Sequence, residues 1–263
     1  MQDKNSHLLA NLSDVFLFVT VYHNNANWFV KVQVKFLGEI RLLKGSQAFL
    51  VELCFSHAKM INMNIQNSAE LIPILRERLE PVELADILSD ALEGQRPNAR
   101  KAAVLLGLFD QDDETHLIFI RRASTLRSHS GEIAFPGGSI DPADSSPVMA
   151  ALREAQEEIG LDPTRVEVLG ILPPVFTVVS NFLITPVVAF LPQGLGTLQL
   201  EASEVAELIL IPLRGLADPA IAHTEEWTRG GLTRTIYFFD HGPYRIWGAT
   251  ARILNMLLEI LAT

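Results

Sequence analysis

The chain has 263 residues, enough for one large or two small domains, and 48% of them are hydrophobic, which is ample for a core. Its net charge of −10 and pI near 5.2 argue against a nucleic-acid surface, because phosphate backbones recruit clustered Lys and Arg. The single cysteine, Cys54, excludes an intramolecular disulfide and a cysteine-based zinc site, and it predicts a reducing, cytoplasmic compartment. No apolar run approaches the roughly 18 residues of a membrane span, and no signal-peptide pattern is recognisable.

The first quarter of the chain differs in composition from the rest. Residues 1–62 carry six Lys or Arg against four Asp or Glu, although the chain as a whole is acidic. This quarter contains strand-like segments but no residues typical of a site. We predict that residues 1–62 are an appended segment produced by an over-extended start, with natural initiation at Met60 or Met63. The main domain is then expected over residues 63–263.

From residue 67 onward the chain predicts mixed helices and strands. Asn67-Ser-Ala-Glu70 is a capping-box pattern that predicts a helix to about Leu79, and Pro81–Ala91 predicts a second helix or a turn. A closing amphipathic helix is expected over Ile246–Leu261. Strands are expected at Val15–Tyr22, Trp28–Phe36, Lys101–Phe109, His116–Arg121, Val166–Leu172, Ile184–Leu191, Glu207–Pro212 and Thr235–Phe239.

A stretch in the middle of the chain combines a glycine turn with an acidic helix. Glu132–Phe135 alternates polar and apolar residues like a short strand, and Pro136-Gly137-Gly138 then predicts a turn. Between Val148 and Ile159, apolar residues recur with the 3.6-residue period of a helix packed on a core. Gly160 stands where a left-handed cap would end that helix.

Three carboxylates lie on one side of this helix. When Ala150–Ile159 is helical, Glu154, Glu157 and Glu158 stand at positions i, i+3 and i+4 and converge on one stripe. Like charges this close disfavour an isolated helix by roughly 0.2 to 0.5 kcal/mol per pair, so either water screens them or a cation binds them. A solvated face is the usual explanation of a Glu-rich helix, but the preceding glycine turn favours a site. Hard oxygen ligands with room for water and phosphate suit Mg²⁺ or Mn²⁺.

These residues resemble the signature of the Nudix hydrolases, G-x5-E-x7-R-E-U-x-E-E-x-G-U, in which U is a bulky aliphatic residue. Counted from Gly138, the first acidic position is Asp144 rather than Glu, eight residues rather than seven precede Arg153, and Ala155 replaces the aliphatic residue. The extra residue falls in a loop, where insertions cost little, so the helix keeps its register. The resemblance implies an α/β fold, a Nudix-type α/β/α sandwich with a mixed β-sheet.

A second motif narrows the resemblance. The run from Ile118 to Gly138 is similar to the extension found in coenzyme A pyrophosphatases, L-L-T-x-R-[SA]-x3-R-x3-G-x3-F-P-G-G. Every specified position matches from Arg122 onward, whereas Phe119 and Ile120 depart from the Leu and Thr at its start. Trp247-Gly-Ala-Thr-Ala251 also resembles that subfamily, and we interpret Trp247 as core packing, with a place at the border of the pocket as the alternative. The likeness covers roughly residues 66–260.

The resemblance implies hydrolysis of a diphosphate linkage by metal-activated water. The three helix glutamates would hold Mg²⁺ or Mn²⁺, with a backbone carbonyl of the glycine turn, here Gly137, as a further ligand. Arg153 would orient these ligands, because it can pair with Glu157 one turn later. The general base could be one of the helix glutamates or Glu204, for which a loop carboxylate in water is the alternative interpretation.

Substrate contacts are expected just upstream of the glycine turn. An acidic protein that acts on an anion needs local cations, and Arg121, Arg122 and Arg127 are close together in the sequence. Arg127 occupies the spaced Arg of the subfamily motif, so we expect it to bind the 3′-phosphate of coenzyme A, with ordinary surface charge as the alternative. His129 is interpreted as a substrate contact or a plain loop histidine, and Gly137-Gly138 as the turn that holds the phosphate against the metal.

Three functions are compatible with these features. The favoured one is a coenzyme A diphosphatase that releases 3′,5′-ADP and 4′-phosphopantetheine from coenzyme A or its thioesters. The second is a broader pyrophosphatase for nucleoside-diphosphate-linked substrates such as ADP-ribose or dinucleotides. The third is a catalytically silent Nudix-fold binding module, against which the intact carboxylate set argues. In each of them the partner is a small molecule rather than a nucleic acid or a membrane.

Overall fold

The structure of the chain is a computed structural model, and it describes residues 5–12, 15–24, 27–36, 67–93, 98–125, 129–229 and 231–262. Its contacts divide the chain into two units, Met1–Cys54 and Phe55–Thr263. Met60 and Met63 lie outside the described residues, so the predicted start of the native chain stays a prediction.

The first unit contains a three-stranded antiparallel sheet. Its strands β1 (Asn5–Leu12), β2 (Val15–Asn24) and β3 (Asn27–Phe36) pair in chain order. The two strands predicted in this region are therefore confirmed as β2 and β3. The interpretation of residues 1–62 as an appended segment stays a prediction.

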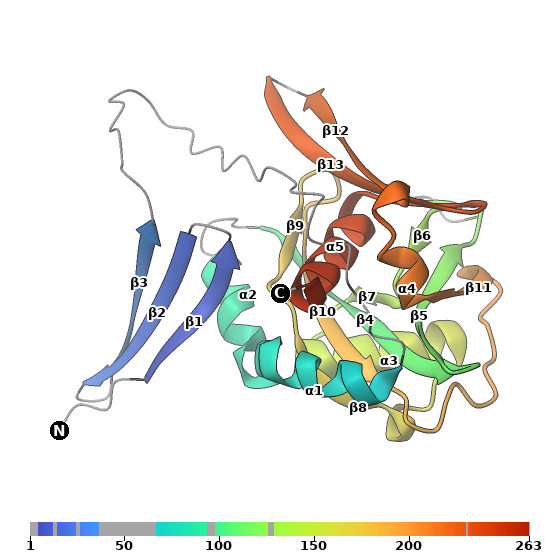
Figure 1. Ribbon diagram of the computed structural model, residues 1–263, viewed down its shortest axis with the longest axis horizontal. Coiled ribbons are helices and arrows are strands. Elements are labelled where there is room, and N and C mark those ends of the chain that lie inside the picture. Colours follow the sequence, from blue (N-terminus) through green and yellow to red (C-terminus); the bar gives the residue numbers. More distant parts are fainter. Residues whose placement is uncertain are drawn as a thin grey trace. The chain divides into compact units, whose positions relative to one another are not determined.

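A mixed sheet forms the centre of the second unit (Figure 1). Its strands run in the order β11-β5-β4-β10-β8, with β6 paired to β5, β7 to β4 and β9 to β10. β4 and β10 pair in parallel, whereas the other pairs are antiparallel. The strands are β4 (Arg100–Gln111), β5 (Glu114–Arg122), β6 (Ile133–Ala134), β7 (Gly137–Ser139), β8 (Glu167–Ile171), β9 (Val175–Thr177), β10 (Phe182–Phe190) and β11 (Val205–Pro212).

The remaining elements of the second unit are helices and a small sheet of its own. The helices are α1 (Ser68–Arg78), α2 (Ala85–Glu93), α3 (Pro147–Ile159), α4 (Leu213–Leu216) and α5 (Gly248–Ala262). The small antiparallel sheet consists of β12 (Ala222–Arg229), β13 (Leu232–His241) and β14 (Tyr244–Trp247). No helix in the described ranges is both long enough and apolar enough to cross a membrane.

Helices cover both faces of the main sheet because its strand residues alternate between two cores. On β4, Leu106 and Leu108 pack in one core with α1 and α5, whereas Leu105 and Phe109 pack in the other with α3. Each fully buried side chain of this size contributes roughly 1.5 to 3 kcal/mol to folding. The predicted α/β/α sandwich with a mixed sheet is confirmed.

The structure departs from the predicted elements in the glycine turn and near the end of the chain. The sequence predicts a turn at Pro136-Gly137-Gly138. Gly137–Ser139 instead forms the short strand β7, because Gly137 pairs with Val104 of β4. The sequence patterns do not predict β1, β9, β12 or β14. β12 has the sequence Ala-His-Thr-Glu-Glu-Trp-Thr-Arg, which lacks the alternation of apolar residues that indicates a half-buried strand.

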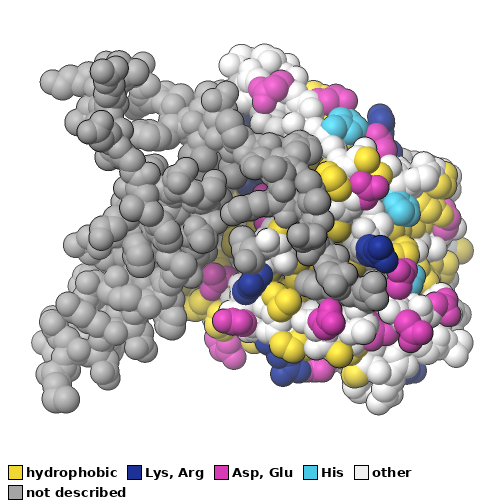
Figure 2. Space-filling model, viewed as in Figure 1, with side chains coloured by type: hydrophobic (Ala, Val, Ile, Leu, Met, Phe, Trp, Pro, Cys, Tyr) yellow, Lys and Arg dark blue, Asp and Glu magenta, His cyan; other side chains and the backbone are white. Residues whose placement is uncertain are grey.

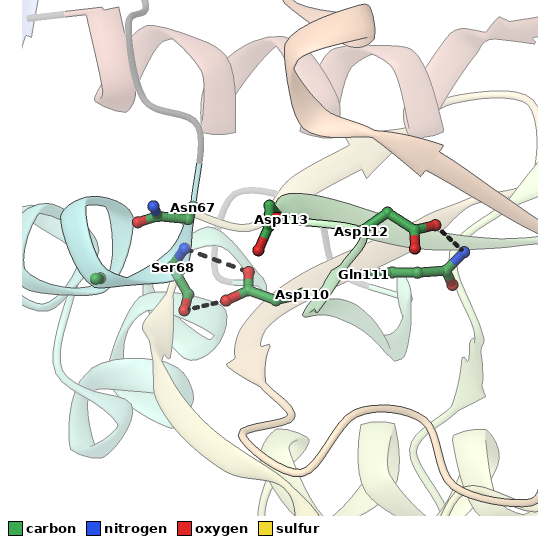
Figure 3. Close-up of a pocket in the computed structure, with 7 residues that line it drawn as sticks. Asn67, Ser68, Asp110, Gln111, Asp112 and Asp113 are labelled. Carbon is green, nitrogen blue, oxygen red and sulfur yellow. Dashed lines mark hydrogen bonds between the residues drawn. The ribbon is translucent and has the colours of Figure 1, made fainter.

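α1 begins with a cap that the sequence pattern misplaces. Asn67 occupies the N-cap position, but its side chain makes no cap hydrogen bond. Instead, the amide and the hydroxyl of Ser68 donate to the Asp110 carboxylate near the end of β4, at 3.2 and 2.5 Å. Figure 3 shows Ser68 and Asp110 facing each other, with the side chain of Asn67 pointing away from Asp110. The predicted capping box is therefore wrong, because a carboxylate distant in sequence provides the acceptor at this helix end.

This cap predicts which residue stabilises the start of α1. Asp110→Ala should lower the free energy of unfolding by about 1 to 2 kcal/mol, because Ser68 loses its acceptor and so does Thr115, which donates to the same carboxylate. Asn67→Ala is the matched control and should cost less than about 0.5 kcal/mol. Urea denaturation of the full chain measures both values, and a larger loss for Asn67→Ala would reinstate the capping box.

Candidate active site

The helix that carries the acidic residues is fixed at both ends by its own sequence. α3 begins after Ser146, whose hydroxyl accepts a hydrogen bond from the Met149 amide at 3.3 Å, and Pro147 fits the first turn. It ends at Gly160, whose φ of 68° is the predicted left-handed cap. A Cβ at Gly160 would come within 2.8 Å of the Gln199 nitrogen, so glycine also lets the following loop pack against the helix end.

The opposite face of α3 determines where its glutamates point. Ala151 and Ile159 are fully buried in the core that α3 shares with β4. With this face of α3 against the core, the Glu158 side chain is only 1% exposed and that of Glu154 16% exposed, whereas that of Glu157 is 60% exposed. The three helix glutamates therefore run from the core to solvent and do not share one environment.

Glu158 is a buried carboxylate held by one hydrogen bond and one ion pair. Its Oε2 accepts a hydrogen bond from the Gly137 amide at 2.9 Å, and its Oε1 lies 3.7 Å from Nη1 of Arg122. Burial raises the pKa of Glu158 to about 7, although the Gly137 amide and Arg122 oppose the rise. Burial also raises the pKa of Glu154, and the charge of Glu204 adds to the rise in both groups. Neighbouring carboxyl groups with raised pKa values are typical of functional sites.

The glycine turn leaves room for these carboxylates. β7 places Gly138 beside Ala103 of β4, and a Cβ at Gly138 would come within 2.5 Å of the Glu154 carboxyl carbon. A side chain at this position would therefore displace Glu154. The amide of Gly137 faces Glu158, and the role of its carbonyl as a metal ligand stays a prediction.

Arg153 joins the loop before α3 to the helix glutamates. Its Nε and Nη2 each donate to the carboxylate of Asp144 at 3.0 Å, which is a bidentate pair. Its Nη1 donates to Glu157 at 2.8 Å and lies 3.1 Å from a carboxylate oxygen of Glu154. The predicted pair with Glu157 is therefore present. Asp144 stands where the family signature has Glu, and it is the residue that holds Arg153 in place.

Alternation along β5 divides the predicted arginine cluster. Arg122 lies beside Glu158, and its Nε is buried without a hydrogen-bond partner in the described part of the chain. Arg121 instead donates to Glu207 at 2.8 Å and lies over the ring of Tyr244. Successive strand residues face opposite sides of a sheet, so the expectation that Arg121 and Arg122 act together is wrong.

The loop between β5 and β6 holds two further candidates. Arg127 lies outside the described residues, and its predicted contact with a phosphate stays a prediction. His129 is exposed and adopts a φ of 56°, and its Nδ1 lies 2.8 Å from Oε2 of Glu132. This contact places His129 at the surface beside Glu132, and its role as a substrate contact stays a prediction.

The loop before β11 is fastened to the end of α3 and brings Glu204 to the helix glutamates. The amide of Glu201 donates to the Glu158 carbonyl at 2.9 Å, and the Glu201 carbonyl accepts from the Glu204 amide at 2.9 Å. The Glu204 carbonyl in turn accepts from the Ala123 amide at 2.8 Å. The sequence predicts Glu204 as a candidate base, but it gives no sign of these anchoring contacts, because they join residues far apart in the chain.

The donors around α3 suit a divalent cation. Glu154, Glu158 and Glu204 interact electrostatically, and carboxylate oxygens are the ligands that Mg²⁺ and Mn²⁺ prefer. A cation would offset the repulsion and the burial that raise the pKa values of Glu154 and Glu158. As they stand, no three His, Cys, Asp or Glu side chains of the described residues are grouped as a metal site, and Glu157 is turned toward Arg153. The residues fit the cation, and coordination by all three helix glutamates stays a prediction.

The surface gives an anionic substrate few cations. Figure 2 shows acidic side chains spread over the described part of one face, with single Lys or Arg residues between them. A chain with a net charge of −10 repels a diphosphate at long range. A diphosphate therefore needs local cations, and the role of Arg122 in binding it stays a prediction.

A mixed sheet between helices, with glutamates on one helix facing a glycine turn, defines a class of hydrolases that act on pyrophosphate bonds. The profile of the NUDIX domain matches residues 98–229. The chain therefore belongs to the Nudix family. It is a hydrolase of pyrophosphate bonds in a family that acts on nucleoside diphosphate derivatives and generally uses divalent metals such as Mg²⁺ or Mn²⁺.

Its relatives carry the same family name. The chain is 40% identical over 162 residues to the uncharacterized Nudix hydrolase NudL of Photorhabdus laumondii, which covers 62% of this chain and 85% of that protein. It is 37% identical over 171 residues to NudL of Citrobacter koseri, covering 65% of this chain and 88% of that one. Among solved structures, a MutT/nudix family protein from Enterococcus faecalis matches with a TM-score of 0.39 and 14% identity, covering 74% of this chain and 73% of that chain.

The Arg153–Asp144 pair predicts a pH dependence of stability. The hydrogen bonds from Arg153 hold the pKa of Asp144 below its usual range. The pair therefore stabilises the folded chain above the unfolded Asp pKa of about 3.9, and this contribution is lost as the pH falls through the lower folded value. Asp144→Asn should lower the melting temperature at about pH 6 and should match the wild type at the acid end of the titration.

Asp141→Asn is the control for this measurement. Asp141 lies 3.9 Å from Arg153 and is 63% exposed, so its substitution should change the melting temperature much less. Melting temperatures are compared from neutral to acid pH. A difference between Asp144→Asn and the wild type that stays constant over this range would contradict the pairing.

Proposed function

We propose that the chain hydrolyses the diphosphate linkage of coenzyme A or its thioesters with Mg²⁺ or Mn²⁺, giving 3′,5′-ADP and 4′-phosphopantetheine or its acyl form. The observation that carries the proposal is the place of Arg122, which begins the matched part of the coenzyme A pyrophosphatase motif. Its guanidinium lies 3.7 Å from Glu158, and its Nε has no hydrogen-bond partner among the described residues. A guanidinium in this position can receive a phosphate oxygen next to the acidic helix.

The residues around α3 have distinct roles in this proposal. Glu154, Glu157 and Glu158 would hold Mg²⁺ or Mn²⁺, which when bound would neutralise phosphate charge and lower the pKa of the attacking water. Arg153 is a positioning residue, because Asp144 fixes its guanidinium while Nη1 contacts Glu157. Glycine at the turn keeps the space beside Glu154 open.

Glu204 is our candidate for the group that takes a proton from the attacking water. Its loop is anchored to the Glu158 carbonyl through Glu201, and its charge raises the pKa of both Glu154 and Glu158, so it lies near both. A general base must be within reach of the water that it deprotonates. One of the helix glutamates is the alternative base.

Phe119 and Ile120, which depart from the coenzyme A motif, lie away from this site. Phe119 and Ile120 are fully buried on β5 and pack in the two cores, so they change core packing rather than substrate contacts. A broader pyrophosphatase that acts on ADP-ribose or dinucleotides is the alternative, because it would use the same glutamates with a different pocket. A silent binding module is disfavoured, since burying Glu158 is costly without a cation to bind.

The metal assignment predicts the effect of removing one carboxylate charge. Glu158→Gln and Glu157→Gln should each lower kcat by at least about a hundredfold, because each removes an anionic ligand while nearly keeping its size. Glu77→Gln, at an exposed position of α1, is the matched control and should keep the wild-type kcat. Turnover of coenzyme A measures the effect, and circular dichroism checks the fold.

Chelation provides the second arm of this experiment. Excess chelator should abolish turnover, and Mg²⁺ or Mn²⁺ should restore it. Near-wild-type kcat in either glutamate variant would contradict the assignment of the site. Full activity in excess chelator would show a metal-free mechanism.

Substrate choice is tested with coenzyme A, ADP-ribose and a diadenosine polyphosphate side by side. Coenzyme A should be cleaved fastest, with 3′,5′-ADP as a product. Arg127→Ala should raise KM for coenzyme A by about tenfold but raise KM much less for dephospho-coenzyme A, which lacks the 3′-phosphate. Arg214→Ala, at an exposed position of α4, is the control. An equal rise in KM for both substrates would show that Arg127 does not bind that phosphate.

A further inference from the structure

The small sheet formed by β12, β13 and β14 presents two different faces. Figure 1 shows its β12–β13 hairpin projecting from the rest of the second unit. One face, with Tyr237, Phe239 and Ile246, is buried in the core. The sequence predicts that Trp247 packs in the core. In the structure Ile246 packs in the core, so the neighbouring Trp247 lies on the opposite face of the strand. That other side, which we call the aromatic face, carries His223, Trp227, Phe238 and Trp247.

The rings of the aromatic face lie nearly parallel across three strands. The His223 and Phe238 rings are 5.0 Å apart with 5° between their planes, and the Phe238 and Trp247 rings are 6.3 Å apart with 11° between theirs. Trp227 stands beside them, 5.7 Å from Trp247 and tilted by 41°. The His223, Phe238 and Trp247 rings are therefore stacked against one another, and the half-exposed Trp227 beside them is where another planar ring can stack.

The exposure of these rings indicates a binding surface. Phe238 is only 4% exposed, whereas Trp227 is 46% exposed. The indole Nε1 of Trp227 donates to Glu225 on its own strand at 2.7 Å, so its polar atom is satisfied and its apolar rings are what remains in solvent. Large apolar groups gathered on a surface mark places where ligands or partners bind.

The charges around the aromatic face favour an uncharged ligand. Arg245 donates two hydrogen bonds to Asp240, at 2.7 and 3.0 Å, and lies over the Phe238 ring. His223 lies 3.7 Å from Asp240. Because Asp240 offsets the charge of Arg245, the face suits a neutral planar ring better than a phosphate.

β14 connects the aromatic face to the candidate active site. It lies against β6, which pairs with β5 at Arg121, one residue before Arg122, and leads into the glycine turn. The hydroxyl of Tyr244 donates to Glu207 at 2.8 Å, and Glu207 also accepts from Arg121. β14 and β5 are therefore neighbours, but they meet through Arg121, whose side chain faces away from α3, and Arg122 beside Glu158 is the next residue of β5.

We propose that the aromatic face binds the adenine base of the substrate by stacking, with Trp227 and Trp247 as the contacting rings. This inference rests on the proposed function, since it assigns the nucleotide half of that substrate to one surface. Bases stack readily on aromatic side chains, whatever their hydrogen-bonding edges. The pantetheine half has no aromatic ring, so its binding does not depend on this face.

Tryptophan fluorescence tests the proposal without relying on turnover. The chain has three tryptophans, and Trp28→Phe leaves only Trp227 and Trp247. In this background, 3′,5′-ADP should quench the fluorescence, and 4′-phosphopantetheine should not. Trp227→Ala should weaken the binding of 3′,5′-ADP and raise KM for coenzyme A by at least about tenfold, with kcat changed by less than about threefold. Trp227→Phe should restore most of the affinity.

Ile87→Ala is the matched control, because Ile87 is a large apolar residue of α2 that is 57% exposed. It should leave KM and the fluorescence titration unchanged. Unchanged KM and affinity for 3′,5′-ADP in both Trp227→Ala and Trp247→Ala would overturn the stacking proposal while coenzyme A hydrolysis stands. Equal quenching by 4′-phosphopantetheine would overturn it as well. If coenzyme A is not hydrolysed but 3′,5′-ADP still binds in a Trp227-dependent way, the proposed function fails and the base site stands.

Discussion

The carboxylate of Glu158, 1% exposed and facing the Gly137 amide and Arg122, is the group on which the arrangement of the site depends. A carboxylate is costly to bury unless donors or a cation offset its charge. Small residues such as Ala151 and Ala155 let α3 lie close to the sheet, and this packing buries the Glu158 side chain in the protein interior. Its hydrogen bond comes from β7 and its ion pair from β5, so the site forms only when both strands are in register with β4.

The same strand that supplies Arg122 also fixes the end of the small sheet. Because side chains alternate along β5, Arg121 faces away from α3 and contacts Glu207 and Tyr244. Two consecutive arginines thus have unrelated roles, one beside the acidic helix and one in a structural contact between β5, β11 and β14. The alternation keeps the second guanidinium from competing for the carboxylate of Glu158.

Local patterns in the sequence predict those parts of the structure that depend on neighbouring residues. The period of α3, its cap at Gly160 and the pair of Arg153 with Glu157 involve contacts within a few residues, and all three are present. Contacts between distant segments leave no such pattern. Ser68 finds its acceptor 42 residues away at Asp110, and no local motif signals it. β12 is missed because its outward residues include Glu and His as well as Trp, so no hydrophobic period appears.

The parallel pairing of β4 with β10 bears on how the chain folds. The register runs from Arg100 opposite Phe182 to Leu108 opposite Phe190, and α3 lies between these strands in the sequence. A parallel pair needs a long crossover, whose closure entropy must be overcome before the strands gain their contacts. α3 therefore packs on a sheet in which segments far apart in the chain are paired. The acidic motif lies in one short stretch, but that stretch alone cannot supply the buried environment of its carboxylates.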